Sequence, residues 1–468
     1  MTRSIATQAA ALLGAAWILA WIIYGPVSGD ALLGFDSYPL IAASAVHSAG
    51  DLFGAFGDEL MGGRYPDGRF YRPLVHLSFG LDHALGGLNP AQYSRTDFSL
   101  VAITATLLGL LAGTLAGALS GASGRAKVFA AVSAAGIYVL HHAQLEVVPY
   151  APRRADALAV LFVAASALAA RRGARPVWIG ALALCALLSK ESGVIALPVA
   201  LAASFTRPGA DLSTAARAAV GPVVGLGLGL VARTAVLGGL GGHAESGTPG
   251  RESLGAMASS MAHAINAAVP GGGVLLGLLV LGGLATLLRQ ADRGGRSTAL
   301  LLIAWAAAGF AITTVSGRFH DWYALTLVAP LAVLAGVSFG RGPFGAVLAT
   351  ALIALVTAGQ LMSPQRDTLS VAQAVSSDQA GRFQALIRAT PPGEAAVFEP
   401  WVFALSTAPG TPPIFVHAPY SLSALAELTL SAGSVEVFTG QDRPAPDPNR
   451  LQVQLVPGPP PPATVTPR

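Results

Sequence analysis

The sequence predicts an all-α bundle that crosses a membrane many times, with a long first outer loop and a small C-terminal α/β domain. Of the 468 residues, 53% are hydrophobic and only 11% are charged, against roughly 25% charged in a soluble globular domain. Apolar stretches that approach the length of a transmembrane helix, about 20 residues, recur along the chain. After residue 362 the composition changes, and short apolar runs alternate with helical stretches, as in a small α/β unit.

Eleven apolar stretches, give or take two, are expected to span the membrane. The first is longer than the apolar segment of a signal peptide, so we expect it to be retained as a helix. Several others are shorter than 20 residues and must tilt, extend or surround a cavity. The pair around residues 189–191 is the weakest, and a re-entrant hairpin is the alternative there. The predicted spans are 5–24, 98–119, 128–140, 157–170, 176–188, 194–205, 218–237, 274–288, 298–315, 324–339 and 344–362.

The distribution of charge predicts the orientation. The inner segments of this eleven-span arrangement hold twelve basic residues against two acidic ones, whereas the outer segments before residue 363 hold ten basic and fourteen acidic residues. Short cytoplasmic loops carry an excess of Lys and Arg. We therefore expect a protein of the inner cell membrane with a cytoplasmic N-terminus and an extracytoplasmic C-terminal domain. The net charge of +4 then reflects membrane orientation, and nucleic-acid binding is not implied.

Three parts of the chain are expected. Residues 1–362 form the transmembrane domain, whose first outer loop covers 26–97. Residues 363–456 form the small α/β domain, and the proline-rich segment 457–468 is expected to be disordered. No repeat of fixed period is visible, which disfavours a transporter built from two recognisable halves.

Asp36 is the first candidate for chemistry. Ionisable groups at a membrane boundary are costly and therefore usually functional, and Asp36 follows the first span by about a dozen residues. A carboxylate there could act as a general base. The alternative is a helix N-cap, because a helical run follows it. Asp58 and Glu59 compete for the acidic role, although a solvated face explains them more simply.

Two further groups of polar residues lie in the first half of the chain. Residues 69–74 read Arg-Phe-Tyr-Arg-Pro-Leu, followed by leucines at helical spacing, which indicates a helix lying on the membrane surface. Residues 141–156 hold His141, Glu146, Arg154 and Asp156 between short apolar spans. Two possible ligands five residues apart are weak support for a divalent metal, so no cofactor is firmly expected and a divalent metal remains the less favoured alternative.

Lys190, Arg233 and Arg318 form the last group, each near the outer end of an apolar stretch. Cations at these positions could hold a phosphate group that enters from the lipid. For each residue alone, snorkelling to the interface or an internal pair such as Lys190 with Glu191 is the simpler explanation.

In their order and spacing, these groups resemble the GT-C superfamily of integral-membrane glycosyltransferases that use polyprenyl-phosphate sugars, especially its protein O-mannosyltransferase-like branch. The resemblance covers about the first 240 residues. Asp36 occupies the first position of the acidic pair found in the family. The other matching positions are Tyr71 to Leu74, Asp82, His141, Glu146, Tyr150, Arg154, Asp156, Lys190, Glu191, Leu197, Pro198 and Arg233 with the glycine-rich segment after it.

The chain also departs from the family pattern. Ser37 stands in place of the second acid of the pair, and His142 stands in place of the usual proline. The missing acid argues against a metal held by that pair. No tetratricopeptide array follows the bundle.

The resemblance implies an inverting sugar transfer at the extracytoplasmic face, with Asp36 as the base. The residues expected to bind the substrate or its phosphate are Arg72, His141, Glu146, Arg154, Asp156, Lys190, Arg233 and Arg318. The partners implied are a polyprenyl-phosphate-linked sugar, membrane lipid and a glycan, lipid or protein acceptor. A transporter or flippase for lipid-linked saccharides, a glycan polymerase and an inactive scaffold remain as alternatives.

Overall fold

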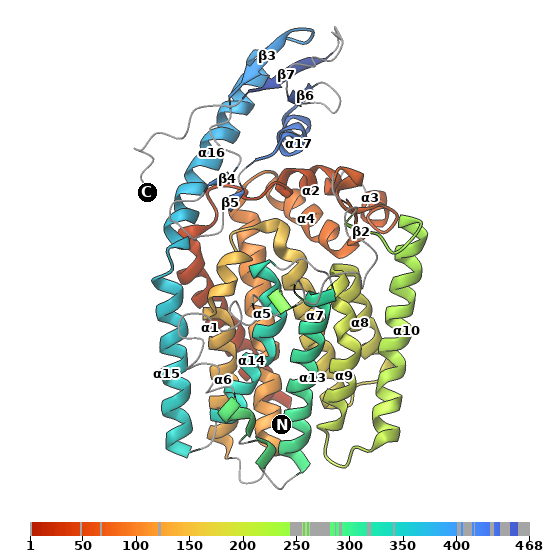
Figure 1. The fold of residues 1–468 in the computed structure, drawn as a ribbon, viewed down its shortest axis with the longest axis vertical. Helices are drawn as coiled ribbons and strands as arrows, with labels where there is room; N and C mark the ends of the chain where they lie inside the picture. Colours follow the sequence, from red (N-terminus) through yellow and green to blue (C-terminus); the bar gives the residue numbers. More distant parts are fainter. Residues whose placement is uncertain are drawn as a thin grey trace.

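Long apolar helices run side by side through most of the molecule in a computed structural model of the chain (Figure 1). Above them lies a layer of short helices, and above that layer stands a small α/β unit. The structure describes residues 2–46, 49–65, 68–119, 123–243, 293–315, 320–339, 342–399, 417–430, 435–439 and 450–456, with short pieces inside 255–289 and at 404–405 and 414–415.

The lower part of the molecule is the helical bundle. Its described helices are α1 (Thr2–Tyr24), α5 (Pro90–Ala118), α6 (Gly124–Leu140), α7 (Arg154–Arg172), α8 (Pro176–Ser189), α9 (Ala196–Phe205), α10 (Leu212–Leu237), α13 (Arg293–Val315), α14 (Leu325–Phe339) and α15 (Gly342–Leu361). Among the described residues, five helical stretches are long and apolar enough to cross a membrane: Ala6–Val27, Pro90–Ala118, Leu212–Leu237, Gly294–Thr314 and Asp321–Ser338. The chain is thus a multi-pass membrane protein, and the total of about eleven spans stays a prediction. The predicted span 274–288 falls mainly outside the described residues.

Glycines bring α8 and α10 into direct backbone contact. A Cβ added to Gly180 would lie 2.4 Å from the carbonyl oxygen of Gly221, and one added to Gly225 would lie 2.2 Å from that of Gly180. Such close approach is how small residues pack helices in lipid, where no hydrophobic drive exists between them. The contact fixes α10 against the bundle and so positions Arg233 near its outer end.

The predicted outer loop 26–97 is largely helical. It contains η1 (Gly25–Val27), α2 (Ser37–Ser44), α3 (Ala49–Gly54), η2 (Leu60–Gly63), the strand β1 (Gly68–Arg69) and α4 (Pro73–Gly86). β1 pairs antiparallel with β2 (Gly242–His243), which follows α10. The helix α5 already begins at Pro90, where the side chain of Asn89 accepts a hydrogen bond from the backbone nitrogen of Ala91. The apolar stretch 98–119 therefore covers only the later part of α5.

The C-terminal unit has the predicted α/β character. The long helix α16 (Gln365–Ala389) leads to a parallel sheet in the order β3 (Ala395–Phe398), β7 (Leu451–Leu455) and β6 (Val435–Thr439). A separate antiparallel pair joins β4 (Ala404–Leu405) to β5 (Ile414–Phe415). The helix α17 (Pro419–Thr429) lies below the sheet and packs against α2 of the outer layer (Figure 1). The predicted disordered segment 457–468 lies outside the described residues.

Polar contacts attach this unit to the first part of the chain. The side chain of Gln373 accepts a hydrogen bond from the backbone nitrogen of Ala31 at 2.6 Å. Arg64 of the outer layer pairs with Glu427 of α17 at 2.7 Å. The ring of His417, which is fully buried, lies 5.7 Å from the ring of Tyr38 in α2. The C-terminal unit is therefore held against the outer layer at several points.

Two buried histidines predict a loss of stability in acid. Burial lowers the pKa of His76 and of His417 to about 4, whereas the unfolded value is about 6.5. The unfolded chain binds more protons between these values, so the stability present above pH 6.5 falls as the pH is lowered towards 4. Each histidine contributes up to about 1.4 kcal/mol per pH unit. Thermal unfolding in detergent at several pH values measures this slope.

The variant His417→Asn gives the control for this slope. It removes one of the histidines whose pKa is lowered by burial, so its melting temperature should depend less steeply on pH than that of the wild type. A wild-type melting temperature that stayed constant from pH 7 to pH 4.5 would contradict the prediction.

Candidate active site

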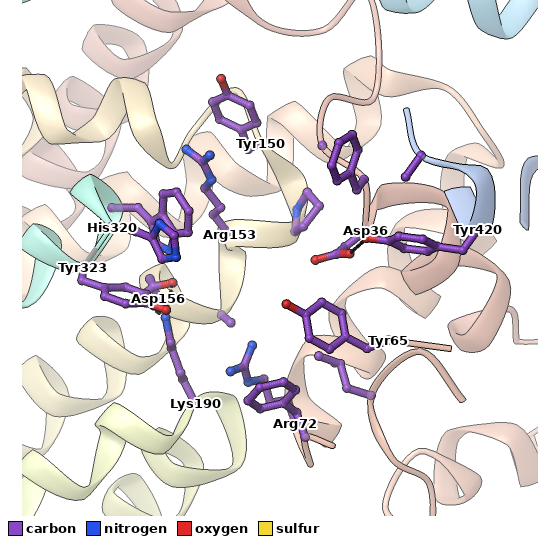
Figure 2. Close-up of a pocket in the computed structure, with 18 of the residues that line it drawn as sticks. Asp36, Tyr65, Arg72, Tyr150, Arg153, Asp156, Lys190, His320, Tyr323 and Tyr420 are labelled. Atoms are coloured by element: carbon purple, nitrogen blue, oxygen red, sulfur yellow. Dashed lines mark hydrogen bonds and ion pairs between the residues drawn. The ribbon is translucent and has the colours of Figure 1, made fainter. Parts of the chain in front are cut away.

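A cavity of about 430 Å³ lies where the outer layer, the outer ends of the bundle helices and α17 meet (Figure 2). This volume is within the usual range for small-molecule sites, about 300 to 1,000 Å³. Its charged lining residues are Asp36, Arg72, Arg153, Asp156 and Lys190, and its aromatic lining residues are Phe35, Tyr65, Phe70, Tyr150, His320, Trp322, Tyr323 and Tyr420. The cavity therefore joins two carboxylates, three cations and aromatic surfaces.

Asp36 lies at the start of α2. It occupies the N-cap position, but in the described structure its side chain makes no capping hydrogen bond. Its Oδ1 instead accepts a hydrogen bond of 2.8 Å from the hydroxyl of Tyr420 (Figure 2). The geometry thus favours a carboxylate directed into the cavity over the capping alternative.

Lys190 and Asp156 form a close pair on another wall. Lys190 Nζ lies 2.6 Å from Oδ1 and 2.7 Å from Oδ2 of Asp156, and 4.1 Å from the centre of the Tyr323 ring. Burial lowers the pKa of Lys190, and the Asp156 carboxylate acts in the opposite direction. The internal pair between Lys190 and Glu191, considered from the sequence, is replaced by this pair with Asp156.

Glu191 bridges two arginines. It accepts hydrogen bonds of 2.7 Å from Arg72 and from Arg233. Burial alone would raise the pKa of Glu191, but these guanidinium groups lower it well below its usual value. Arg72 reaches the cavity, and within the described residues its buried Nε has no hydrogen-bond partner. Arg72 therefore retains a donor for an anionic ligand.

Arg153 is a cavity cation that the sequence analysis did not select. Its Nη1 lies 2.5 Å from Oε2 of Glu146 and 2.6 Å from the carbonyl oxygen of the same residue. Its guanidinium lies between the rings of Tyr150 and Trp322, 3.9 and 3.8 Å from their centres. Gln365, at the start of α16, donates a further hydrogen bond to Glu146. Glu146 thus fixes Arg153 from behind and does not itself line the cavity.

Arg154 lies in the protein core, which corrects the expectation that it contacts the substrate. Its fully buried guanidinium pairs with Asp82 at 2.7 Å and with Asp97 at 2.8 Å, and it donates to the carbonyl oxygen of Tyr93. No face of this group is accessible to a donor phosphate. Arg154 instead joins α7 to α4 and α5.

Two other predicted site residues, His141 and Arg233, do not line the cavity. His141 is buried, and its Nδ1 accepts a hydrogen bond from the backbone nitrogen of Ala143, which caps η3 (His142–Glu146). Arg233 is buried behind Arg72, with Glu191 between them. Arg318 lies outside the described residues. In the part of the chain that the structure describes, no group of three or more His, Cys, Asp or Glu side chains could hold a metal ion.

The aromatic wall was also absent from the predicted site. His320 stacks on Trp322 with ring centres 4.1 Å apart and planes 3° apart, beside the η6 turn (Asp321–Ala324). The aromatic residues clustered at 320–323 in the sequence were the available signal for this wall. Tyr420 had no local signal because, apart from its neighbours Ala418 and Pro419, the other lining residues lie far from it along the chain.

Comparison with known proteins gives similarities in structure. No protein-family model and no curated protein matches the sequence. The structure of ArnT from Cupriavidus metallidurans in the apo state has a TM-score of 0.49 and 16% identity, covering 91% of this chain and 74% of that one. The structure of the same protein bound to undecaprenyl phosphate has a TM-score of 0.45 and 17% identity, covering 81% and 71%.

The oligosaccharyltransferase of Archaeoglobus fulgidus in the apo form has a TM-score of 0.42 and 12% identity, covering 95% of this chain and 64% of that one. At these TM-scores and identities the similarity carries no argument about function, so the assignment of function rests on the residues of the cavity.

Proposed function

We propose that this protein is a GT-C-type membrane glycosyltransferase that moves a sugar from a polyprenyl-phosphate donor to an acceptor hydroxyl at the extracytoplasmic face. One observation carries the proposal. The carboxylate of Asp36 and the cations Arg72, Arg153 and Lys190 line the same cavity at one end of a membrane bundle. Sugar transfer from a phosphate requires a base for the acceptor and positive charge at the leaving group.

The reaction can be written as one displacement. The acceptor oxygen attacks the anomeric carbon, and its proton passes to Asp36 as the new carbon–oxygen bond forms. The bond between the anomeric carbon and the phosphate oxygen breaks, and its electron pair stays on the polyprenyl phosphate. Attack opposite to the leaving group inverts the configuration of the anomeric carbon.

The cations are arranged to stabilise the leaving phosphate. Arg72 and Arg153 are each held by one carboxylate behind them, Glu191 and Glu146. Lys190 is held by both oxygens of Asp156. Groups fixed before the reaction stabilise developing charge without the cost of reorienting in the transition state. The neighbouring apolar helices allow the lipid chain of a donor to stay in the membrane.

The carboxylates that line the cavity are poorly suited to binding a divalent metal. Both oxygens of Asp156 are within hydrogen-bonding distance of Lys190, and Oδ1 of Asp36 accepts from Tyr420. A divalent cation takes several oxygen ligands, and a neighbouring ammonium group opposes its binding. We therefore assign the stabilisation of the phosphate to Arg72, Arg153 and Lys190.

Replacement of Arg72 tests the role of the cations. Arg72→Gln should lower kcat about 100-fold, as the loss of one preorganised donor does in other active sites. The bridging carboxylate of Glu191 keeps its bond to Arg233, so the fold is expected to remain intact. The measurement is the release of polyprenyl phosphate by purified protein in nanodiscs.

The matched control is Arg69→Gln. Arg69 belongs to the same segment but pairs with Glu59, and its side chain is 55% exposed. This variant should keep the wild-type kcat. Equal turnover by Arg72→Gln and wild type would contradict the assigned role.

A transfer assay across a panel of polyprenyl-phosphate sugars tests the function itself. Release of polyprenyl phosphate together with a glycosylated acceptor supports the proposal. Movement of the intact lipid-linked sugar between leaflets, without cleavage, would indicate a transporter or flippase. Products of increasing length from a single acceptor would indicate a polymerase.

A further inference from the structure

The C-terminal unit forms one wall of the cavity. Ala418, Pro419 and Tyr420, at the start of α17, line it together with residues of the first outer layer. The hydroxyl of Tyr420 donates to Oδ1 of Asp36 at 2.8 Å. Its ring meets that of Phe35 edge to face, with centres 6.5 Å apart. Figure 2 shows Tyr420 and Tyr65 beside Asp36, with Arg153 and Lys190 across the cavity.

We infer that Tyr420 is a positioning residue for Asp36, and that the C-terminal unit is part of the catalytic machinery. This inference rests on the proposed role of Asp36 as the base. A hydroxyl bound at Oδ1 restricts rotation of the carboxylate and so holds it in one orientation toward the acceptor. A hydrogen bond to the ionised form also favours that form, which is the form able to act as a base.

The contact between Tyr420 and Asp36 belongs to a built interface. His417, three residues before Tyr420, is fully buried against Tyr38, two residues after Asp36. Further along α17, Glu427 pairs with Arg64 of the outer layer. Contacts with the outer layer therefore precede and follow Tyr420 along the C-terminal unit. The geometry of the hydrogen bond follows from the packing of two helices and does not depend on one exposed side chain.

Other charged and titratable groups face Asp36 across the cavity. They come from the outer loop, from the segment before α7, from the first turn of α7, from the loop after α8 and from the segment that leads into α14. They are Tyr65, Arg72, Tyr150, Arg153, Asp156, Lys190, His320 and Tyr323. The substitution Tyr420→Phe leaves all of them in place and retains the ring against Phe35. A change in the pH dependence of turnover then reports the lost hydroxyl.

The test compares kcat against pH for wild type and Tyr420→Phe. The variant should lose about tenfold in kcat, the usual effect of one hydrogen bond to a charged group, and its acid limb should move to higher pH. The KM for the donor and the melting temperature should stay unchanged. Glu427→Gln is the matched control. Glu427 lies in the same helix as Tyr420, and its substitution weakens only the contact with Arg64 of the outer layer. The acid limb of this variant should stay where it is in the wild type. If the wild type is active and Tyr420→Phe shows the same dependence of kcat on pH, the inference is overturned.

A second measurement does not need turnover and so separates the two proposals. In protein labelled with ¹³C at aspartate carboxyl groups, the Asp36 signal is identified by its loss in Asp36→Asn. Its titration midpoint should be higher in Tyr420→Phe than in wild type. Wild type that transfers no sugar contradicts the proposed function, whereas equal midpoints in the two proteins contradict the positioning role of Tyr420.

Discussion

The variant Asp36→Asn is expected to lose sugar transfer by about 10³-fold or more, because removal of a general base costs roughly 10² to 10⁴ in rate. The asparagine has the shape of the aspartate, and its side-chain oxygen can still accept the hydrogen bond from Tyr420. It cannot accept the proton of the acceptor hydroxyl. Binding of the polyprenyl-phosphate sugar and the yield of folded protein should stay close to wild type. Polyprenyl phosphate release and lipid binding, both in nanodiscs, measure the two effects separately.

Asp58→Asn is the control for this loss. Asp58 is exposed in the same outer layer and borders a different cavity, of about 290 Å³, beside His76. Its substitution should leave turnover unchanged. Near wild-type turnover by Asp36→Asn would instead direct attention to Asp156, the second carboxylate that lines the larger cavity.

The variant Arg154→Met should show the largest loss of stability. It leaves the carboxylates of Asp82 and Asp97 without their buried cation, and breaking a buried ion pair from one side costs about 3 to 5 kcal/mol. Methionine fills much of the same volume, so the loss should come mainly from the uncompensated charges. The melting temperature and the monodisperse yield in detergent are the measurements.

Two further proteins complete this experiment. Asp378→Asn removes an exposed pair with Arg382, whose nearest atoms are 3.9 Å apart, and should change stability by no more than about 0.5 kcal/mol. Adding Asp82→Asn and Asp97→Asn to Arg154→Met should recover part of the lost stability, since the buried charges are then removed together. An Arg154→Met protein as stable as wild type would rule out the assigned structural role.

The sequence was sufficient to predict the bundle and the α/β unit, because long apolar stretches and alternating short runs reflect local backbone requirements. The side-chain contacts of adjacent residues were harder to predict. Arg153 precedes α7 and reaches the cavity, whereas Arg154 is the first residue of α7 and is enclosed by acids. A difference of one residue in where a helix begins changes the direction of a side chain by about 100°. The sequence pattern does not determine that boundary to within one residue.

Lys190 and Glu191 show the same limit. As neighbours of opposite charge they suggest a pair, but the backbone at Lys190 is extended, with φ −162° and ψ 153°. Successive side chains on extended backbone point to opposite sides, so Lys190 meets Asp156 while Glu191 meets two arginines. Glycines that bring α10 close to α8 are visible in the sequence, but the pairing of these two helices is a property of the folded chain.

The bond between Tyr420 and Asp36 has a consequence for biosynthesis. The two residues are 384 positions apart in the chain, and a ribosome adds about 5 to 20 residues per second, so roughly 20 to 80 s separate their synthesis. During that interval the first helices already lie in the membrane, where the proposed donor lipid would be found. A nascent or prematurely terminated chain lacks the tyrosine proposed to orient the base, so until translation has passed residue 420 its turnover of the lipid-linked sugar should be lower by about tenfold or more.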